Sequence, residues 1–231
     1  MNFGGIIETS VIDYPKKIST VLFTIGCNFA CHFCHNVDLI TGNTLTISEE
    51  ELLSNLEKSS KLIEGVVLTG GEPTIYKDLP DFIKKVKDLG FSVKLDTNGS
   101  NPDMIAHLIN NNLIDYIAMD IKHNLLEPNK YKFITGKEDL DVYTILESIN
   151  LIKKSTIDYQ FRTTLIKEIH TVYDIYEISV TILNADLYVL QTFRPDIVFN
   201  KEWSNYRAFT SEELNKILEM IKPNIKKIEI I

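Results

Sequence analysis

The sequence is poor in cysteine and tryptophan: its 231 residues include three cysteines and one tryptophan. The cysteine count is odd, and all three cysteines lie between residues 27 and 34, which makes a poor disulfide framework. In a reducing compartment, a cluster of free thiols instead points to metal binding or catalysis. We therefore expect a cytoplasmic protein whose cysteines carry chemistry.

Long apolar runs and long basic runs are also missing. No stretch reaches the roughly 18 apolar residues of a membrane span, and residues 1–15 lack the basic and apolar regions of a secretion signal. The 24 Lys and Arg against 32 Asp and Glu give a net charge of −8, which repels a phosphate backbone. We expect neither a membrane nor a nucleic acid as a partner. No Ser-His-Asp triad or GxSxG element is recognisable either.

Short β-branched runs alternate with longer segments of helical periodicity along the whole chain. This alternation is typical of βα units that build a parallel sheet, and the nearly continuous hydrophobicity of the short runs suits strands buried on both faces. The expected strands are 19–26, 64–70, 91–97, 116–122, 159–166 and 186–193. The expected helices are 49–61, 79–89, 102–112, 139–155, 171–183 and one that follows residue 210.

The order of these segments predicts an α/β fold, an incomplete (β/α)6 TIM-like barrel. A closed barrel of eight units typically needs about 250 residues, which is more than this chain has. We expect a single domain over 1–231, with the barrel core at about 19–193 and a C-terminal extension at about 194–231. The last residues of the sequence, KKIEII, suit one more strand, which we place beside the N-terminal segment.

The cysteines occur in the segment GCNFACHFCHN, directly after the first expected strand. This position is the C-terminal end of a barrel strand, where the chemistry of βα barrels is found. A CxxxCxxC spacing lets Cys27, Cys31 and Cys34 ligate three irons of a cubane cluster and leaves the fourth iron open to an outside ligand. The competing interpretation is structural zinc completed by His32 or His35, although such sites usually draw ligand pairs from separated segments.

Polar residues also follow the next three expected strands. They are Thr69-Gly70-Gly71-Glu72-Pro73, Asp96-Thr97-Asn98-Gly99 and Asp120-Ile121-Lys122. The two adjacent glycines permit a close approach of the backbone to a ligand, and the proline fixes the exit of the turn. Each group alone suits an ordinary turn or a surface pair. Their recurrence at successive strand ends, which meet at one mouth of a barrel, favours a binding site there.

Three further residues are candidates because of where they fall. Arg162 lies within an apolar expected strand, and because an unpaired buried guanidinium is unfavourable, it should pair with an internal acidic group or face a ligand carboxylate. His170 follows the same strand, and Gln191 lies in the sixth. For these last two, a helix cap or a hydrogen-bonded turn residue is the competing interpretation.

Together these motifs resemble the radical S-adenosylmethionine (SAM) enzymes, with Phe33 as the aromatic residue before the third cysteine. Cys34-His35-Asn36 and the segment IDYP at 12–15 are similar to the activating enzymes of glycyl radical enzymes, above all that of anaerobic ribonucleoside-triphosphate reductase. The resemblance implies a 4Fe-4S cluster on the three cysteines and SAM on the open iron. It also implies SAM-binding roles for Gly70, Gly71, Glu72, Pro73, Asp96, Asn98, Lys122 and Arg162, a monovalent cation beside Asp120, His170 near the ribose and Gln191 near the adenine.

The resemblance further implies an activity and two protein partners. A flavodoxin or ferredoxin-type donor would reduce the cluster, SAM would be cleaved, and a hydrogen atom would be taken from a glycine of a partner enzyme. One alternative keeps this chemistry but acts on a small molecule, as in the short enzymes that make 7-carboxy-7-deazaguanine. The other alternative is a non-catalytic zinc or iron-sulfur binding module.

Overall fold

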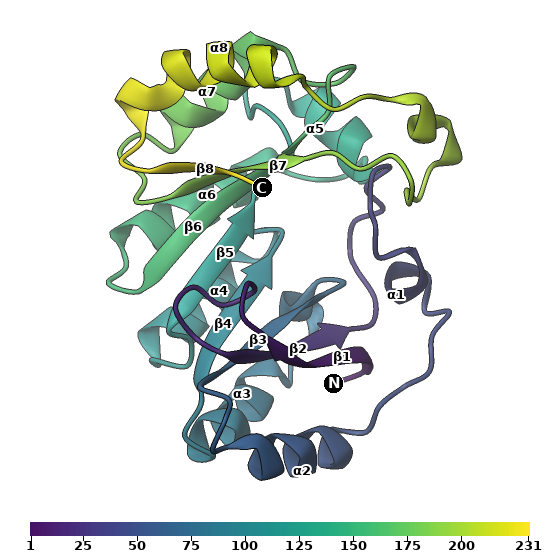
Figure 1. Ribbon diagram of the computed structural model, residues 1–231, viewed down its shortest axis with the longest axis vertical. Coiled ribbons are helices and arrows are strands. Elements are labelled where there is room, and N and C mark those ends of the chain that lie inside the picture. The colour runs from purple at the N-terminus through teal and green to yellow at the C-terminus, as the bar shows by residue number, and fades with distance from the viewer.

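The computed structural model describes residues 1–231, and its strands form one curved sheet in the order β1 to β8 (Figure 1). Strand β1 is antiparallel to β2, and every later neighbouring pair is parallel. The expected parallel α/β architecture is therefore confirmed. The strands are β1 (Phe3–Ser10), β2 (Ser19–Thr24), β3 (Gly65–Gly70), β4 (Ser92–Thr97), β5 (Tyr116–Asp120), β6 (Asp158–Leu165), β7 (Tyr188–Thr192) and β8 (Ile228–Ile230).

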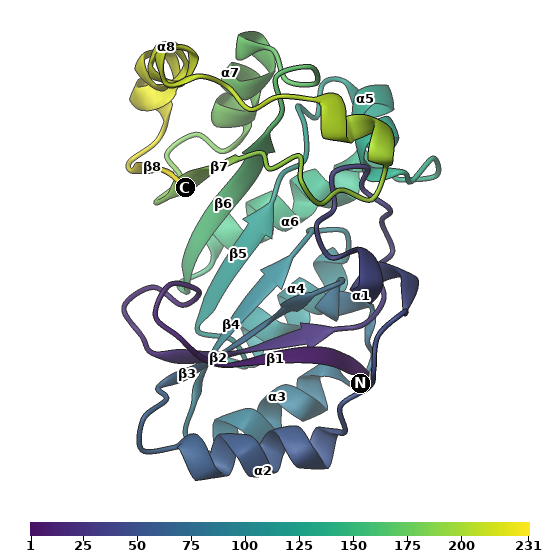
Figure 2. The same cartoon turned by 45° about the vertical axis from the view of Figure 1, so that its right-hand side comes forward.

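The longer helices lie on the outer face of the sheet, with α2 and α3 beside its β1 end and α7 and α8 beside its β8 end, whereas α1 and α5 lie near the C-terminal ends of the strands (Figure 2). A core of 46 buried hydrophobic residues joins these helices to the strands. The helices are α1 (Val37–Thr41), α2 (Glu49–Ser59), α3 (Leu79–Asp88), α4 (Pro102–Asn110), α5 (Pro128–Thr135), α6 (Val142–Lys154), α7 (Val172–Thr181) and α8 (Ser211–Ile221). Three short 3-10 helices are η1 (Pro73–Ile75), η2 (Lys201–Asn205) and η3 (Lys222–Asn224). None of the helices has the length and apolar character needed to cross a membrane.

Several helix ends follow from local sequence. The Ser48 side chain accepts from the backbone of Glu51 at the start of α2, and Asn101 accepts from Met104 at the start of α4. Thr210 and Glu213 form a reciprocal capping box at α8. Such caps satisfy backbone groups that the first helical turn leaves free, so they fix where each helix begins.

The C-terminal strand forms as expected, but its predicted partner is wrong. Strand β8 pairs with β7, in the register Val189 to Glu229, and the N-terminal strand β1 pairs with β2 instead. The physical reason is that β7, α8 and β8 make one more crossover unit, which returns the chain parallel to the preceding strand. The two edge strands, β1 and β8, do not pair with each other, so the barrel stays open.

The inner face of the sheet is closed at the N-terminal ends of its strands by the IDYP segment. Tyr14 is buried, and its ring lies 5.9 Å from that of Tyr116. These two rings pack with Val21, Val67 and Ala118 in a small cluster separate from the main core. The apolar floor that they form leaves the C-terminal ends of the strands as the polar end of the sheet.

Candidate active site

A cavity of about 540 Å³ lies at the C-terminal ends of the strands. Of the residues predicted from the sequence, all except Pro73 and His170 line it. The predicted residues on its wall are Cys27, Cys31, Cys34, Gly70, Gly71, Glu72, Asp96, Asn98, Asp120, Lys122, Arg162 and Gln191. Segments up to 164 residues apart in the sequence, from Cys27 to Gln191, therefore meet in one place.

The cysteine loop is held by two short helices that the sequence did not predict. The backbone N–H groups of Ala30 and His32 donate to the last carbonyls of α5, those of Thr135 and Ile134, at 2.8 and 3.2 Å. On the other side, the N–H of Gly26 donates to the carbonyl of Leu39 in α1 at 2.8 Å. The loop is thus fixed by backbone contacts, which leave its thiol groups free to face the cavity.

All three thiols are free, and their surroundings raise their pKa values. Burial, with the nearby carboxylate of Glu72 as the second cause, raises the pKa of Cys27 to about 12. Burial also raises the pKa of Cys31 to about 12, and it raises the pKa of Cys34. At neutral pH, a metal must therefore displace a proton from each sulfur that it binds.

The spacing of these sulfurs disfavours a mononuclear zinc site. Zn–S bonds of about 2.3 Å place two thiolates roughly 3.8 Å apart. The sulfur atoms of Cys27, Cys31 and Cys34 do not all lie within 4.8 Å of one another. His32 instead packs its ring against Phe133 and Trp203. Three separated thiols suit a cluster better, because each binds a different iron.

The two glycines after β3 let the loops at the ends of β2 and β3 come together. Gly70 has a φ of +106°, and a Cβ on Gly71 would lie 1.8 Å from the carbonyl oxygen of Gly26. That same carbonyl accepts from the N–H of Glu72 at 2.9 Å. The glycine pair thus fixes the backbone directly before Cys27.

We expect Gly71→Ala to lower the free energy of unfolding by about 3 kcal/mol or more, because its Cβ would force a backbone shift. Gly90→Ala is the matched control, since Gly90 has a φ of +91° and a Cβ there would meet nothing within 4 Å, and we expect a loss of about 1 kcal/mol. Chemical denaturation measures both. Equal losses in the two variants would contradict the close approach of Gly71 to Gly26.

Glu72 links the end of β3 to the end of β4 through a carboxylate whose two oxygens both accept hydrogen bonds. Its Oε1 accepts from the Thr74 N–H at 3.0 Å and from the Thr74 and Thr97 hydroxyls at 2.5 and 2.8 Å. Its Oε2 accepts from the N–H of Asn98 at 2.6 Å. Burial outweighs these bonds and raises the pKa of Glu72. The side chain therefore positions the Asn98 turn as well as lining the cavity.

Alternation along the strands places five charged groups on the inner face of the sheet. Arg162 lies opposite Asp120 in the register of β5 and β6, and its Nε donates to Asp120 Oδ1 at 2.6 Å. The Nη1 of Arg162 donates to Asp96 Oδ2 at 2.8 Å. Lys94 and Lys122 donate to the remaining oxygens of Asp96 and Asp120, at 2.5 and 2.8 Å. The expected pairing of Arg162 with internal acidic groups is confirmed.

This network leaves an excess of positive charge and no free carboxylate oxygen. Three cations face two carboxylates, which leaves a net charge of +1. Burial alone would raise the pKa values of Asp96 and Asp120, but Arg162 and the lysines hold both below the ordinary range. Protein cations contact all four oxygens, but each Asp120 oxygen accepts one hydrogen bond and keeps a further lone pair, so the monovalent cation beside Asp120 stays a prediction.

His170 and Pro73 lie outside the cavity wall, so their expected contact with a ligand stays a prediction. The buried ring of His170 accepts from the N–H of Ile166 through Nδ1 at 3.1 Å, so Nε2 carries the proton and donates to the carbonyl of Lys122 at 3.0 Å. Both nitrogens are therefore occupied by the protein. His170 positions the backbone of Lys122, and Pro73 begins the helix η1.

The cavity wall also contains residues that sequence reasoning missed. Thr164 is two residues beyond Arg162 and so shares its face of β6, a signal that alternation could have supplied. Asn36 donates to the carbonyl of Gly70 at 2.9 Å, which no local pattern reveals. Phe29, Ile40, Thr192, Arg194 and Ile231 also line the wall without any sequence signal, whereas Phe33, His35, Thr69 and Thr97 belong to the motifs already noted in the sequence.

Comparison with known families identifies the superfamily of this chain. Residues 21–178 match the radical SAM superfamily. The chain belongs to this superfamily. It is therefore an enzyme of the radical SAM type, and the family implies a 4Fe-4S cluster and SAM. The cavity fits these groups, because it joins three free thiols, one of them buried and two partly buried, to a polar wall with excess positive charge.

Individual relatives are similar over different shares of this radical SAM chain. It is 35% identical to a Methanocaldococcus jannaschii protein provisionally named a glycyl-radical enzyme activating enzyme, over 98% of this chain and 94% of that protein. A second protein of that organism with the same provisional name is 31% identical, over 80% of this chain and 70% of its own length. A Pyrococcus horikoshii protein provisionally named GTP 3′,8-cyclase is 34% identical, but over 62% of this chain and 44% of that protein.

Solved radical SAM structures share the fold at low sequence identity. A radical SAM methyltransferase from Sphaerobacter thermophilus superposes with a TM-score of 0.69 at 12% identity, over 94% of this chain and 67% of that one. Streptococcus suis SuiB bound to S-adenosylmethionine gives a TM-score of 0.63 at 15% identity, over 90% of this chain and 49% of that one. These two similarities support the open parallel architecture.

Proposed function

We propose that this enzyme is an activase: it holds a 4Fe-4S cluster on Cys27, Cys31 and Cys34, cleaves SAM at the open iron, and generates a glycyl radical on a partner enzyme. The observation that carries the proposal is the convergence of three free thiols with the GGEP, DTNG and DxK strand ends on one cavity. Similarity to two proteins named as activating enzymes, one of them over nearly its whole length, supports this substrate class.

Cys27, Cys31 and Cys34 would hold the cluster, which would supply the one electron needed to cleave the S–C5′ bond of SAM reductively. The residues of the chain bind and orient SAM. The net positive charge of the network around Arg162 attracts the carboxylate of SAM, and the ammonium of Lys122, paired with Asp120, adds to this charge on the cavity wall. The Asn98 amide lies 3.9 Å from the sulfur of Cys27, where it can stabilise negative charge on a thiolate.

The far wall of the cavity suits the nucleoside part of SAM. Gln191 accepts from the hydroxyl of Thr164 at 3.3 Å through its carbonyl oxygen, so its amide N–H groups remain for an adenine acceptor. Asp96, although engaged by two cations, lines the same cavity as the cysteines and Gln191. We assign SAM contacts to Asp96, Asn98, Lys122, Arg162 and Gln191, together with the glycine pair.

We further propose anaerobic ribonucleoside-triphosphate reductase as the partner and a flavodoxin or ferredoxin-type protein as the electron donor. The support for the reductase is the sequence Cys34-His35-Asn36 together with IDYP, whose Tyr14 closes the opposite end of the sheet's inner face. We propose a reducing compartment, the cytoplasm, for this reaction, because the three cysteines are free thiols that lie within eight residues of the sequence.

The test combines the anaerobically reconstituted protein with SAM, dithionite and the candidate reductase. We expect the electron paramagnetic resonance doublet of a glycyl radical, together with 5′-deoxyadenosine in an amount close to that of the radical. A reductase whose radical glycine is replaced by alanine is the control and should give no doublet. If SAM is cleaved but none of the candidate partners acquires a protein radical, the activase assignment is wrong, while the SAM chemistry stands.

A further inference from the structure

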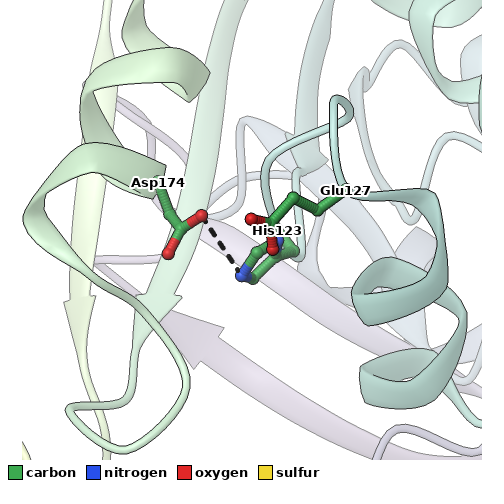
Figure 3. Close-up of side chains that lie close together, drawn as sticks. All are labelled: His123, Glu127 and Asp174. Carbon is green, nitrogen blue, oxygen red and sulfur yellow. Dashed lines mark ion pairs between the residues drawn. The ribbon is translucent and has the colours of Figure 1, made fainter.

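A second group of metal-binding side chains lies outside the cavity, where the loop after β5 meets the start of α7 (Figure 3). His123, Glu127 and Asp174 each present one ligand atom, and these atoms all lie within 4.8 Å of one another. The side chains of His123 and Asp174 are 0% and 2% exposed, whereas that of Glu127 is 39% exposed. The group is therefore buried on two sides and reaches solvent at Glu127.

The hydrogen bonding of His123 fixes which nitrogen faces this group. Its Nδ1 lies 3.4 Å from the backbone carbonyl of Asn124, which can only accept, so Nδ1 carries the proton. Its Nε2 then presents a lone pair and has no hydrogen-bond partner, although it is buried. In Figure 3, Nε2 points toward Asp174, whose Oδ1 is 3.7 Å away. A buried lone pair that faces a carboxylate is unfavourable unless a cation lies between them.

The two carboxylates are also placed to receive a cation. Asp174 uses Oδ2 to accept from the N–H and hydroxyl of Thr171, which leaves Oδ1 directed at His123. Glu127 Oε2 lies 2.5 Å from the ammonium of Lys130, in an orientation that makes no hydrogen bond. Lys130 is half exposed and free to move into solvent. Without it, two negative charges and one imidazole lone pair face a common point.

We propose that His123, Glu127 and Asp174 bind a divalent transition-metal ion, and that Zn²⁺ suits them best. One imidazole nitrogen and two carboxylate oxygens leave a fourth tetrahedral position for water, on the exposed side of Glu127. The carbonyl that holds Nδ1–H is the partner that a metal-binding histidine usually has on its other nitrogen. Bonds of about 2.0 to 2.2 Å require the ligand atoms to close in by roughly 1 Å, which the rim side chain of Glu127 can supply.

The bound ion would have a structural role. It would tie the loop 123–127 to the N-terminus of α7, next to Lys122. The ring of His170, which holds the carbonyl of Lys122, stacks on His123 with centroids 5.3 Å apart. The metal would therefore stabilise the segment that carries Lys122 without entering the cavity.

The test uses the full chain with its iron-sulfur cluster reconstituted anaerobically, stripped of loosely bound metal on a chelating resin and then titrated with Zn²⁺. We expect one zinc per chain by mass spectrometry, and a zinc K-edge X-ray absorption spectrum that shows nitrogen and oxygen neighbours only. Glu127→Gln should weaken zinc binding at least tenfold. Glu138→Gln, which changes an exposed carboxylate beyond the end of α5, is the matched control and should bind as the wild type does.

Three results would overturn the proposal: no zinc retained at micromolar concentration, sulfur neighbours in the spectrum, or unchanged affinity in Glu127→Gln. Glu127 makes no side-chain cap bond to α5, so this substitution should leave the fold intact. As a second readout, Zn²⁺ should raise the melting temperature of the wild type and of Glu138→Gln, but not that of Glu127→Gln. A protonated His123 paired with Asp174 would give no such zinc-dependent shift.

Discussion

Replacing Cys31 with alanine should remove the iron-sulfur cluster and lower the rate of SAM cleavage at least about a thousandfold, a loss of roughly 4 kcal/mol in transition-state stabilisation. Cys31 is buried on the cavity wall, and nearby cysteines are limited to the other two proposed ligands, so no spare thiol can replace it. Iron content, the broad visible absorbance of the cluster and the yield of 5′-deoxyadenosine measure the result. Cys27→Ala and Cys34→Ala should behave alike.

His32→Gln is the control for the zinc alternative in which His32 is the fourth ligand. His32 lies between two of the cysteines, but its ring packs against Trp203 at 5.0 Å and not in the cavity wall. We expect this variant to keep its iron and its activity. Full activity in any cysteine variant, or loss of the metal in His32→Gln, would contradict a cluster held by the three thiols.

Replacing Arg162 with glutamine should lower the free energy of unfolding by about 3 kcal/mol and weaken SAM binding. The loss lies at the low end of the range for a broken buried ion pair, because Lys94 and Lys122 still face the two carboxylates. Arg207→Gln is the matched control. Arg207 pairs with Glu168 at 2.7 Å but is 69% exposed, so its loss should remain under about 1 kcal/mol.

The effect of Arg162 should also depend on pH in a defined direction. The network holds the pKa values of Asp96 and Asp120 below the ordinary value of about 3.9, so its stabilisation is complete above that pH. The difference between wild type and Arg162→Gln should be full at pH 7 and should shrink as the pH falls below about 4. Urea unfolding at several pH values measures it, and a difference that grows on acidification would refute the charge network as its source.

Alternation of apolar and helical segments predicted the parallel strands β2 to β7, because strands with helices on one side and a packed interior on the other need apolar residues on both faces. It did not predict α1 or α5. Helix α1 buries no residue, so it carries no periodic signal, and α5 is shorter than the windows in which periodicity is legible. These helices hold the cysteine loop, so the support of the site was harder to predict than the site itself.

The residues of the candidate site were predictable because they follow the C-terminal ends of parallel strands, and these ends converge. What could not be predicted was how each polar group is satisfied. His170 looks like a ligand in the sequence, yet its two nitrogens are taken by the backbone of Ile166 and Lys122. The sequence around Asp120 gives no sign of its partner, yet Arg162 of the neighbouring strand lies in register with it and forms an ion pair with it. Such pairings arise only when distant segments are folded together.

The unjoined strands β1 and β8 have a mechanical consequence. In a closed barrel, widening the mouth would break hydrogen bonds between strands, but this open sheet could widen through small changes of twist distributed over its seven strand pairings. A polypeptide loop could thus be admitted from the side and released again without any local unfolding. The outer edge of β1 is partly paired, since the Phe3 carbonyl accepts from the N–H of Ile47, and a loop that inserted beside β8 would shield that strand's edge from pairing with other strands.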